Sequence, residues 1–161
     1  MFDYNEAFSR NLGWVTPQEQ QRLRQARVAV AGMGGVGGVH VHALARLGIG
    51  HFNLTDYDSF ELANFNRQAG AAMSTLGQSK VEVMQAYVQD VNPESAVRLF
   101  PDGLFPENLG DYLDHVDVLI DAIDFFANDL RPELYRAARA PDPRGLCGAL
   151  GLGGFLDRFH A

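Results

Sequence analysis

RVAVAGMGGVGG, residues 27–38, predicts the central unit of the fold. Positions 28–31 are apolar without alternation, which is typical of a strand covered on both faces of a parallel sheet. Gly32, Gly34 and Gly37 follow with GxGxxG spacing, and apolar residues then recur at a helical period up to position 47. A second strand is predicted over residues 51–55. The stretch therefore predicts a β-loop-α-β unit with a glycine-rich loop.

Strands and helices alternate on both sides of this unit. Thr16 and Glu19 form a capping-box pattern with Pro17 in the first helical turn, which predicts a helix up to about Gln25. This alternation predicts an α/β fold: a Rossmann-like, doubly wound, mainly parallel sheet with helices on both faces. The further elements are predicted as a loop or short helical turns over 59–75, helices over 79–90, 107–113 and 132–140, and strands over 96–100 and 116–120.

Three segments are predicted along the chain. Residues 1–26 form an N-terminal helical arm, residues 27–140 a nucleotide-binding Rossmann-like domain, and residues 141–161 an irregular tail rich in glycine and proline. The last predicted helix should lead into another buried strand, and the tail has no strand pattern. The tail is therefore interpreted either as a loose extension or as a sign that the chain is truncated or frame-shifted after about Pro141.

Composition and charge narrow the classes of function. With 161 residues, 47% of them hydrophobic, the chain can bury the core of one domain. Its net charge of −7 disfavours general attraction to nucleic acid or to an anionic membrane. No apolar stretch reaches the roughly 20 residues that span a bilayer, and the N-terminus lacks the apolar core of a secretory signal. Cys147 is the only cysteine, which excludes an internal disulfide and predicts a cytoplasmic protein.

The glycine loop predicts a phosphate-binding site. Glycines let the backbone approach phosphates closely, and the free N–H groups at the start of the following helix attract negative charge. Asp56 ends the second predicted strand, where a carboxylate can hold a ribose hydroxyl. To this point the pattern fits NAD as well as ATP.

The residues after Asp56 favour a triphosphate. Asn64, Arg67, Gln68 and Lys80 add two amides and two cations. A departing pyrophosphate needs such fixed positive charge, whereas the pyrophosphate of a dinucleotide is already served by the glycine loop. Arg67 alone could be a solvated surface charge, and Lys80 alone could be a snorkelling side chain. Their occurrence after one glycine loop predicts ATP as the ligand.

Two carboxylates complete the predicted site. Asp121 and Asp124 end the fourth strand, at the edge of such sheets where ligands bind. A carboxylate there suits magnesium, which prefers few carboxylates together with phosphates and water. A plainer interpretation of Asp121 is that it caps the next helix.

Several of these motifs resemble the ThiF/MoeB-type branch of the ubiquitin-activating-enzyme superfamily. They are GMGGVGG, LTDYDSFELANFNRQ, TLGQSK, NPE at residues 92–94 and LIDAID, and the resemblance covers residues 8–139. It implies an adenylyltransferase that binds ATP and magnesium. Carried over by position, it implies a cofactor site of Gly32, Gly34, Gly35, Gly37, Asp56, Asp58, Asn64 and Gln68, with Arg67, Lys80, Asp124 and Arg10 in catalysis.

The resemblance also implies individual roles. Asp56 would bind the ribose, Lys80 would lie on the α- to γ-phosphate side, and Asp124 would bind the magnesium. Arg10 would reach into the site of a partner subunit, which implies a homodimer. The sequence departs from the family where Phe125 stands in place of the usual Asn, where CxxC zinc pairs are absent, and where the family continues well past this length. Cys147 lies in the tail and is interpreted as a bystander.

The leading hypothesis is ATP-dependent adenylation of a carboxylate. The resemblance implies the C-terminus of a small ubiquitin-like sulfur-carrier protein as the substrate. One alternative is an enzyme like tRNA threonylcarbamoyladenosine dehydratase, which the NFNRQ and DAID segments also resemble, although the acidic net charge disfavours a tRNA partner. Others are a truncated fragment that binds nucleotide or dimerises without catalysis, and an NAD-dependent oxidoreductase, which leaves Arg67, Lys80 and Asp124 without a shared purpose.

Overall fold

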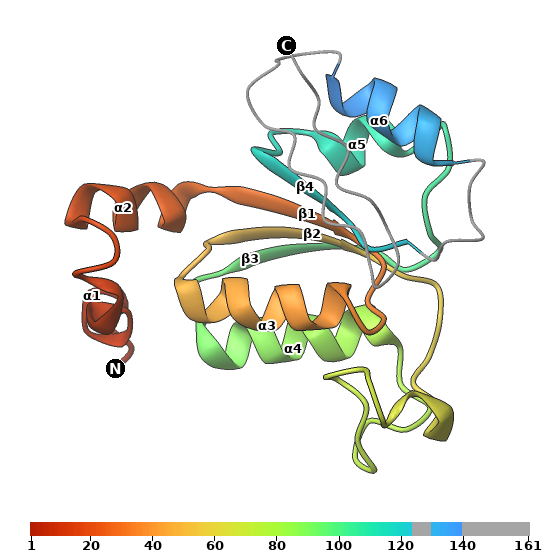
Figure 1. Cartoon of the computed structure of the whole chain (residues 1–161), viewed down its shortest axis with the longest axis horizontal. Coiled ribbons are helices and arrows are strands. Elements are labelled where there is room, and N and C mark those ends of the chain that lie inside the picture. Colours follow the sequence, from red (N-terminus) through yellow and green to blue (C-terminus); the bar gives the residue numbers. More distant parts are fainter. Residues whose placement is uncertain (124–129, 140–161) are drawn as a thin grey trace.

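The chain folds around a four-stranded parallel sheet (Figure 1). The computed structural model describes residues 1–123 and 130–139. The strands lie in the order β3-β2-β1-β4, and every pair of neighbours is parallel. Their bounds are β1 Arg27–Ala31, β2 His51–Thr55, β3 Ala96–Phe100 and β4 Val118–Asp121. The predicted Rossmann-like α/β fold is confirmed.

Helices cover both faces of the sheet, as predicted (Figure 1). Val28 and Val30 of β1 pack into a core with α3 (Gly37–Leu47) and α4 (Lys80–Val91). Ala29 and Ala31 point to the other face and pack with α5 (Leu109–Leu113) and α6 (Arg131–Arg139). The period-two alternation of side chains along β1 therefore serves two cores, which is why the strand has no polar face.

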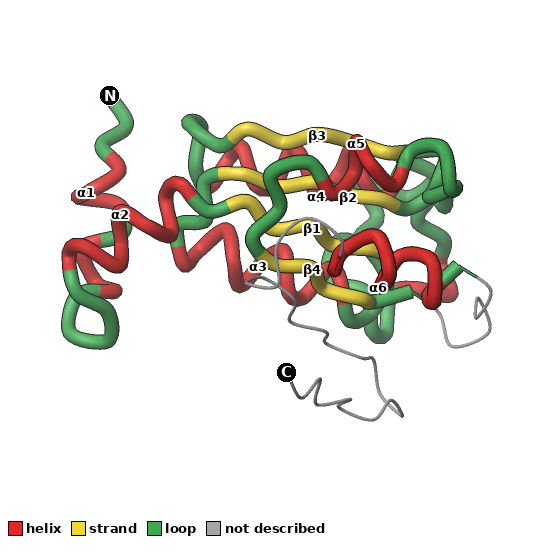
Figure 2. The backbone as a smooth tube through the Cα atoms, turned by 90° about the horizontal axis from the view of Figure 1, so that it is seen from above, coloured by secondary structure: helices red, strands yellow, loops and turns green. Residues whose placement is uncertain are grey.

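The order of the strands creates a switch point beside β1. The chain passes from β1 to β2 and β3 on one side and then returns to place β4 on the other side of β1 (Figure 2). In sheets of this kind ligands bind outside the carboxyl ends of the strands at the switch point. The glycine loop follows β1 directly, so it lies at this point.

Two predicted boundaries differ from the structure by two residues. Helix α5 begins at Leu109, because the Asn108 side chain accepts a hydrogen bond from the Phe105 N–H and holds the preceding residues in a turn. Strand β4 begins at Val118, because the chain first turns at His115, which has a left-handed φ of 55°. Both turns depend on contacts that hydrophobic periodicity does not report.

The N-terminal arm consists of α1 (Tyr4–Ala7), η1 (Ser9–Asn11) and α2 (Pro17–Gln25). The predicted capping box at Thr16 and Glu19 is present. Three buried or half-buried side chains fasten the arm to the carboxyl end of α3. The Tyr4 hydroxyl donates to the Gly48 carbonyl at 2.6 Å, and the Gln20 and Asn11 amides both donate to the Leu47 carbonyl at 3.0 Å. Within the described residues, no helix is long and apolar enough to cross a membrane.

Candidate nucleotide-binding site

The glycine loop is packed against the end of β4. Gly32 has a φ of +94°, and a Cβ atom there would lie 2.5 Å from the Ala122 carbonyl oxygen. A Cβ atom on Gly37 would lie 1.7 Å from the Gly32 carbonyl oxygen. These approaches leave no room for any side chain, so both positions require glycine. The loop therefore turns sharply at the switch point between β1 and β4.

The turn leaves a row of backbone donors open. In the described part of the chain, no acceptor is hydrogen-bonded to the backbone N–H groups of Gly34, Gly35, Val36 and Gly37. These groups begin α3, where the partial positive charge of the helix adds to their attraction for an anion. A phosphate group at this point would satisfy several of them at once.

Asp56 connects the glycine loop to the end of β2. One carboxylate oxygen accepts the Met33 N–H at 2.6 Å, and the other accepts the Asp58 N–H at 2.9 Å. The predicted ribose residue thus lies directly beside the loop, and its orientation is fixed by two backbone donors. The Met33 N–H was not identified from the sequence, since a backbone group at a variable position of GxGxxG carries no sequence signal.

The connection from β2 to α4 lies over the loop. Gln68 is 7% exposed, and its amide nitrogen lies 3.7 Å from the position of a Cβ on Gly34. Its Oε1 atom is buried and has no hydrogen-bond partner among the described residues. Buried polar atoms are rarely left unpaired, and of the three such atoms among the described residues, which include Ser95 Oγ and Tyr112 Oη, this one belongs to the residue beside the glycine loop.

Two further predicted residues belong to the same connection. The side-chain stem of Arg67 lies 3.6 Å from the position of a Cβ on Gly35, while its guanidinium donates to the Ala63 carbonyl at 2.8 Å. Asn64 is buried and its Oδ1 accepts the Glu61 N–H at 2.9 Å, within the short helix η2 (Leu62–Asn64). Asn64 therefore shapes the connection from inside, and Arg67 covers the glycine loop.

Lys80 lies at the first residue of α4 and is almost fully buried. Its ammonium donates to the Asp58 carboxylate at 2.9 Å. Asp58 is in turn held by Asp56, which contacts the loop. The structure therefore brings the loop glycines, Asp56, Asp58, Asn64, Arg67, Gln68 and Lys80 together at the carboxyl ends of the strands.

Asp121 is occupied by protein contacts. It is fully buried at the end of β4, where Arg131 Nε donates to it at 2.7 Å and the Tyr135 hydroxyl at 2.5 Å. The Ile123 N–H donates to its other oxygen at 3.0 Å. Asp121 thus fixes α6 to the sheet through the side chains of Arg131 and Tyr135, whereas the plainer interpretation from the sequence was that it caps the next helix. Burial, and secondly the charge of Asp121, hold the pKa of the Tyr112 phenol well above its usual value.

Two predicted site residues are not among those that the described part of the chain brings together at the glycine loop. Arg10 is exposed on the arm, at the opposite end of the molecule from the glycine loop (Figure 1). It is therefore not brought to the site of its own chain. Asp124, the predicted magnesium ligand, lies outside the described residues, as do Phe125 and Cys147. The described residues contain no group of three or more His, Cys, Asp or Glu side chains that could hold a metal ion.

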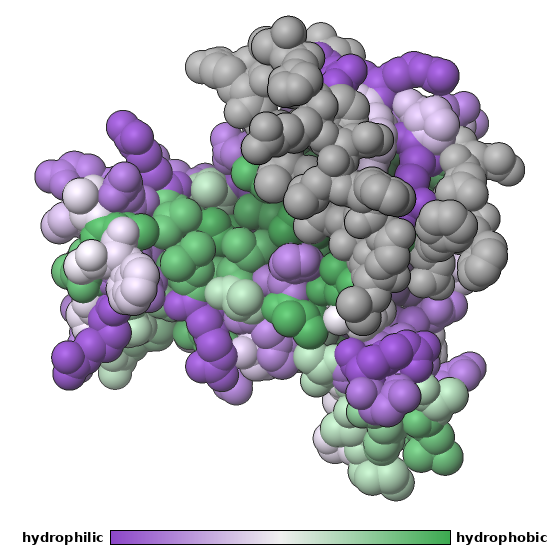
Figure 3. Space-filling model, viewed as in Figure 1, coloured by the Kyte–Doolittle hydropathy of each residue, from purple (hydrophilic) through white to green (hydrophobic). Residues whose placement is uncertain are grey.

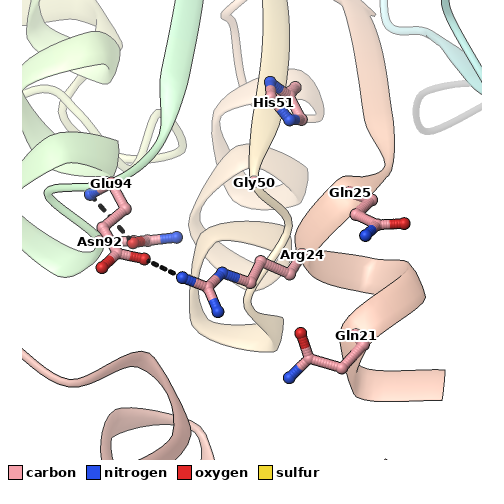
Figure 4. Close-up of a pocket in the computed structure, with 7 residues that line it drawn as sticks. All are labelled: Gln21, Arg24, Gln25, Gly50, His51, Asn92 and Glu94. Atoms are coloured by element: carbon pink, nitrogen blue, oxygen red, sulfur yellow. Dashed lines mark hydrogen bonds and ion pairs between the residues drawn. The ribbon is translucent and has the colours of Figure 1, made fainter. Parts of the chain in front are cut away.

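A hollow of about 380 Å³ lies at the amino ends of the strands, among α2, the start of β2 and the end of α4 (Figure 4). Arg24 in this hollow is paired with Glu94 at 2.7 Å. Its cation is therefore already neutralised, and the hollow is far from the glycine loop.

The chain belongs to the ThiF family, which residues 8–153 match. Among curated proteins it is 45% identical to a tRNA threonylcarbamoyladenosine dehydratase from Haemophilus influenzae, over 76% of this chain and 47% of the relative. It is 34% identical to a sulfur carrier protein adenylyltransferase from Thermus thermophilus, over 70% of this chain and 41% of the relative.

Solved structures give the same relationship. The crystal structure of Escherichia coli tRNA N6-threonylcarbamoyladenosine dehydratase superposes with a TM-score of 0.85 at 32% identity, covering 95% of this chain and 63% of that one. A crystal structure of the same enzyme in complex with ATP gives a TM-score of 0.80 at 32% identity, covering 95% of this chain and 62% of that one. The chain spans about half the length of the curated relatives it matches.

Proposed function

We propose that this chain provides the nucleotide-binding part of an enzyme that uses ATP to adenylate a carboxylate. The observation that carries the proposal is the set of unused polar groups at the switch point. Within the described residues, the N–H groups of residues 34–37 and Gln68 Oε1 have no hydrogen-bond partner, and they belong to the same end of the sheet as Asp56 and Lys80. Donors suit phosphates, and an acceptor suits a hydroxyl or amino group of the nucleotide.

In this proposal each group of site residues contacts a different part of the nucleotide. Asp56 holds the ribose, the glycine loop holds the phosphates, and Arg67 and Lys80 neutralise the charge that develops on the pyrophosphate. A carboxylate oxygen of the substrate forms a bond to the α-phosphorus, and the bond to the bridging oxygen breaks as pyrophosphate departs. Most of the rate enhancement then comes from positioning and charge neutralisation. Magnesium supplies further neutralisation when bound, with Asp124 as its proposed ligand.

For the substrate, the relatives favour a tRNA nucleoside over a carrier protein. Three tRNA threonylcarbamoyladenosine dehydratases match at 39–45% identity, whereas the sulfur-carrier adenylyltransferase matches at 34%. The sequence hypothesis gave first place to a sulfur carrier, and the comparisons support its alternative better. The proposed carboxylate is therefore that of a threonylcarbamoyl group on a tRNA adenosine.

A sulfur-carrier C-terminus is the second candidate. The net charge of −7 supports it, because tRNA binding normally relies on neutralising phosphates with Lys and Arg. The two substrates are separable in one assay: pyrophosphate exchange stimulated by modified tRNA and weakened by salt supports the first, whereas stimulation by a small ubiquitin-like sulfur-carrier protein supports the second.

A homodimer is part of the proposal. Arg10 cannot act at its own site from the far end of the molecule, so it is proposed to act at the site of a second copy (Figure 1). Apolar side chains are exposed at both ends. Leu12 and Trp14 follow Arg10 on the arm, and Leu62 and Met73 lie on the lobe at the lower right of Figure 3, formed by the connection from β2 to α4. Analytical ultracentrifugation tests the assembly, and a monomer at all concentrations contradicts it.

The first experiment is a calorimetric titration of the chain with ATP and magnesium, with NAD alongside. We expect selective binding of ATP that weakens in Asp56→Ala, and preference for NAD would reject the proposal.

In pyrophosphate exchange, Lys80→Ala is expected to lower the rate by about 10²–10³, because one electrostatic contact to the transition state is lost. Arg22→Ala, an exposed cation on α2, is the matched control and should leave exchange unchanged.

A further inference from the structure

Lys80 is the only lysine in the chain, against twelve arginines. Its side chain is 6% exposed, which is unusual because lysines are seldom buried. An arginine fork is planar and larger, whereas an ammonium is a compact point charge with three donors. The single use of lysine at the one buried cation of the site indicates that this position needs a point charge.

The ammonium of Lys80 is only partly satisfied. It has three N–H donors, and within the described residues its hydrogen bonds reach one acceptor, Asp58 Oδ2 at 2.9 Å. Two donors of a buried cation are left over, and leaving such donors unpaired is costly. The two remaining donors therefore suit a further anionic partner.

Asp58 is itself held in place from two sides. Its N–H donates to Asp56 Oδ1 at 2.9 Å, and its carbonyl accepts the Lys80 N–H at 3.0 Å. Asp56 Oδ2 accepts the Met33 N–H of the glycine loop. A continuous chain of bonds thus runs from the loop through Asp56 and Asp58 to the ammonium, while the Asp58 carboxylate stays 51% exposed.

We propose that Asp58 is a positioning residue: it holds the ammonium of Lys80 beside the glycine loop so that its two spare donors meet the phosphates of ATP. This inference rests on the proposed function and changes the predicted role of Asp58, which acts through Lys80 and does not bind the nucleotide. The carboxylate also carries a negative charge near the phosphates. Removing that charge therefore strengthens ground-state binding of ATP while it loosens the group that acts in the transition state.

The opposite signs of these two effects give the first test. In Asp58→Asn we expect ATP to bind about three- to tenfold more tightly at low salt, and turnover in pyrophosphate exchange to fall about 10- to 100-fold. Asp58→Glu keeps the charge and is expected to recover most of the turnover. Asp114→Asn is the matched control, since Asp114 is 46% exposed and pairs with Arg98 at 3.3 Å away from the site.

A second readout needs no catalysis. Because Lys80 is the only lysine, an amine-reactive acylating reagent can modify only it and the N-terminus, and mass spectrometry of peptides separates the two. We expect slow modification of Lys80 in the unsubstituted chain and in Asp114→Asn, severalfold faster modification in Asp58→Asn, and protection by ATP. Thermal melts show whether each variant is folded, and Asp58→Glu should behave like the unsubstituted chain.

The outcomes separate the inference from the proposed function. If the unsubstituted chain binds no ATP, the proposed function fails and the inference fails with it. If it binds ATP but Asp58→Asn matches Asp114→Asn in ATP affinity and in Lys80 modification, the inference alone is overturned. A fall in ATP affinity in Asp58→Asn with Lys80 modified as slowly as in the unsubstituted chain also overturns it, because Lys80 would then still be in place and Asp58 would act on the nucleotide directly.

Discussion

The amino ends of the strands, here the amino edge of the sheet, and their carboxyl ends, the carboxyl edge, differ in how most of their polar groups are paired. At the amino edge the arm and the end of α3 satisfy one another: the Gln20 amide bonds Tyr4, Leu47 and Asn11, and Arg24 pairs with Glu94. At the carboxyl edge the glycine-loop N–H groups, Gln68 Oε1 and two donors of Lys80 have no hydrogen-bond partner among residues 1–123 and 130–139. Both edges are rich in polar residues, so polarity alone does not distinguish them.

This difference distinguishes polar groups that stabilise the fold from polar groups that are available to bind a ligand. A closed network adds to the stability of the native state and offers nothing to a solute, whereas unused donors that converge define a binding site. The hollow of about 380 Å³ lies at the amino edge, where the polar groups pair with one another, so its presence does not by itself indicate a binding site (Figure 4). The comparison can be tested by substitutions at each edge.

The largest effect is expected from Arg131→Ala. Asp121 is the exception at the carboxyl edge, since it is fully buried and fully engaged. Removing Arg131 leaves a buried carboxylate without its counter-charge, so the free energy of unfolding should fall by about 3–5 kcal/mol. Urea denaturation followed by circular dichroism measures this loss.

The control for that variant is Arg98→Ala. Arg98 pairs with Asp114 at 3.3 Å, but both side chains are about half exposed. An exposed ion pair contributes less than about 1 kcal/mol, so the two arginine variants should differ clearly. Equal losses would mean that the closed contacts around Asp121 do not anchor α6.

Local patterns were sufficient to predict the glycine loop and the elements around it. The bounds of β1 and of α3 follow from a continuous apolar run and from a helical period that ends at Gly48 in the left-handed conformation. Asp56 was also predictable beside the loop, since strand β2 must end next to β1. These features depend on residues close in sequence.

The pairing within the site depends on the path of longer connections and could not be predicted. Lys80 lies 22 positions from Asp58, and the connection between them must fold back before they meet. The sequence left Asp121 open between a carboxylate suited to magnesium and a helix cap, and in the structure Arg131 and Tyr135 donate to it. In α6 the i, i+4 spacing of Arg131 and Tyr135 places a cation and a hydroxyl on one face, but the predicted helix of 132–140 left Arg131 outside it.

A smaller effect is expected at the amino edge from Gln20→Ala. Gln20 is 4% exposed, and its loss leaves Asn11 and the Leu47 carbonyl short of a partner. The expected cost is about 1–3 kcal/mol of stability with no change in ATP affinity. Gln18→Ala, on the exposed face of the same helix, is the control. A parallel loss of ATP binding in folded Gln20→Ala would show that the two edges are coupled through α3.

The smallest effect is expected from Glu94→Gln, which breaks the ion pair with Arg24 and leaves that guanidinium over the Tyr4 ring, 4.6 Å from its centroid. Both partners are 40% or more exposed, so solvent screens the pair and the loss should stay below about 1 kcal/mol. Because screening strengthens with salt, the difference from the unsubstituted chain should vanish near 1 M sodium chloride. A larger loss of stability that persists at high salt would mean that Glu94 belongs to the closed network. Charged pairs at the amino edge would then stabilise the fold as much as its amide hydrogen bonds do.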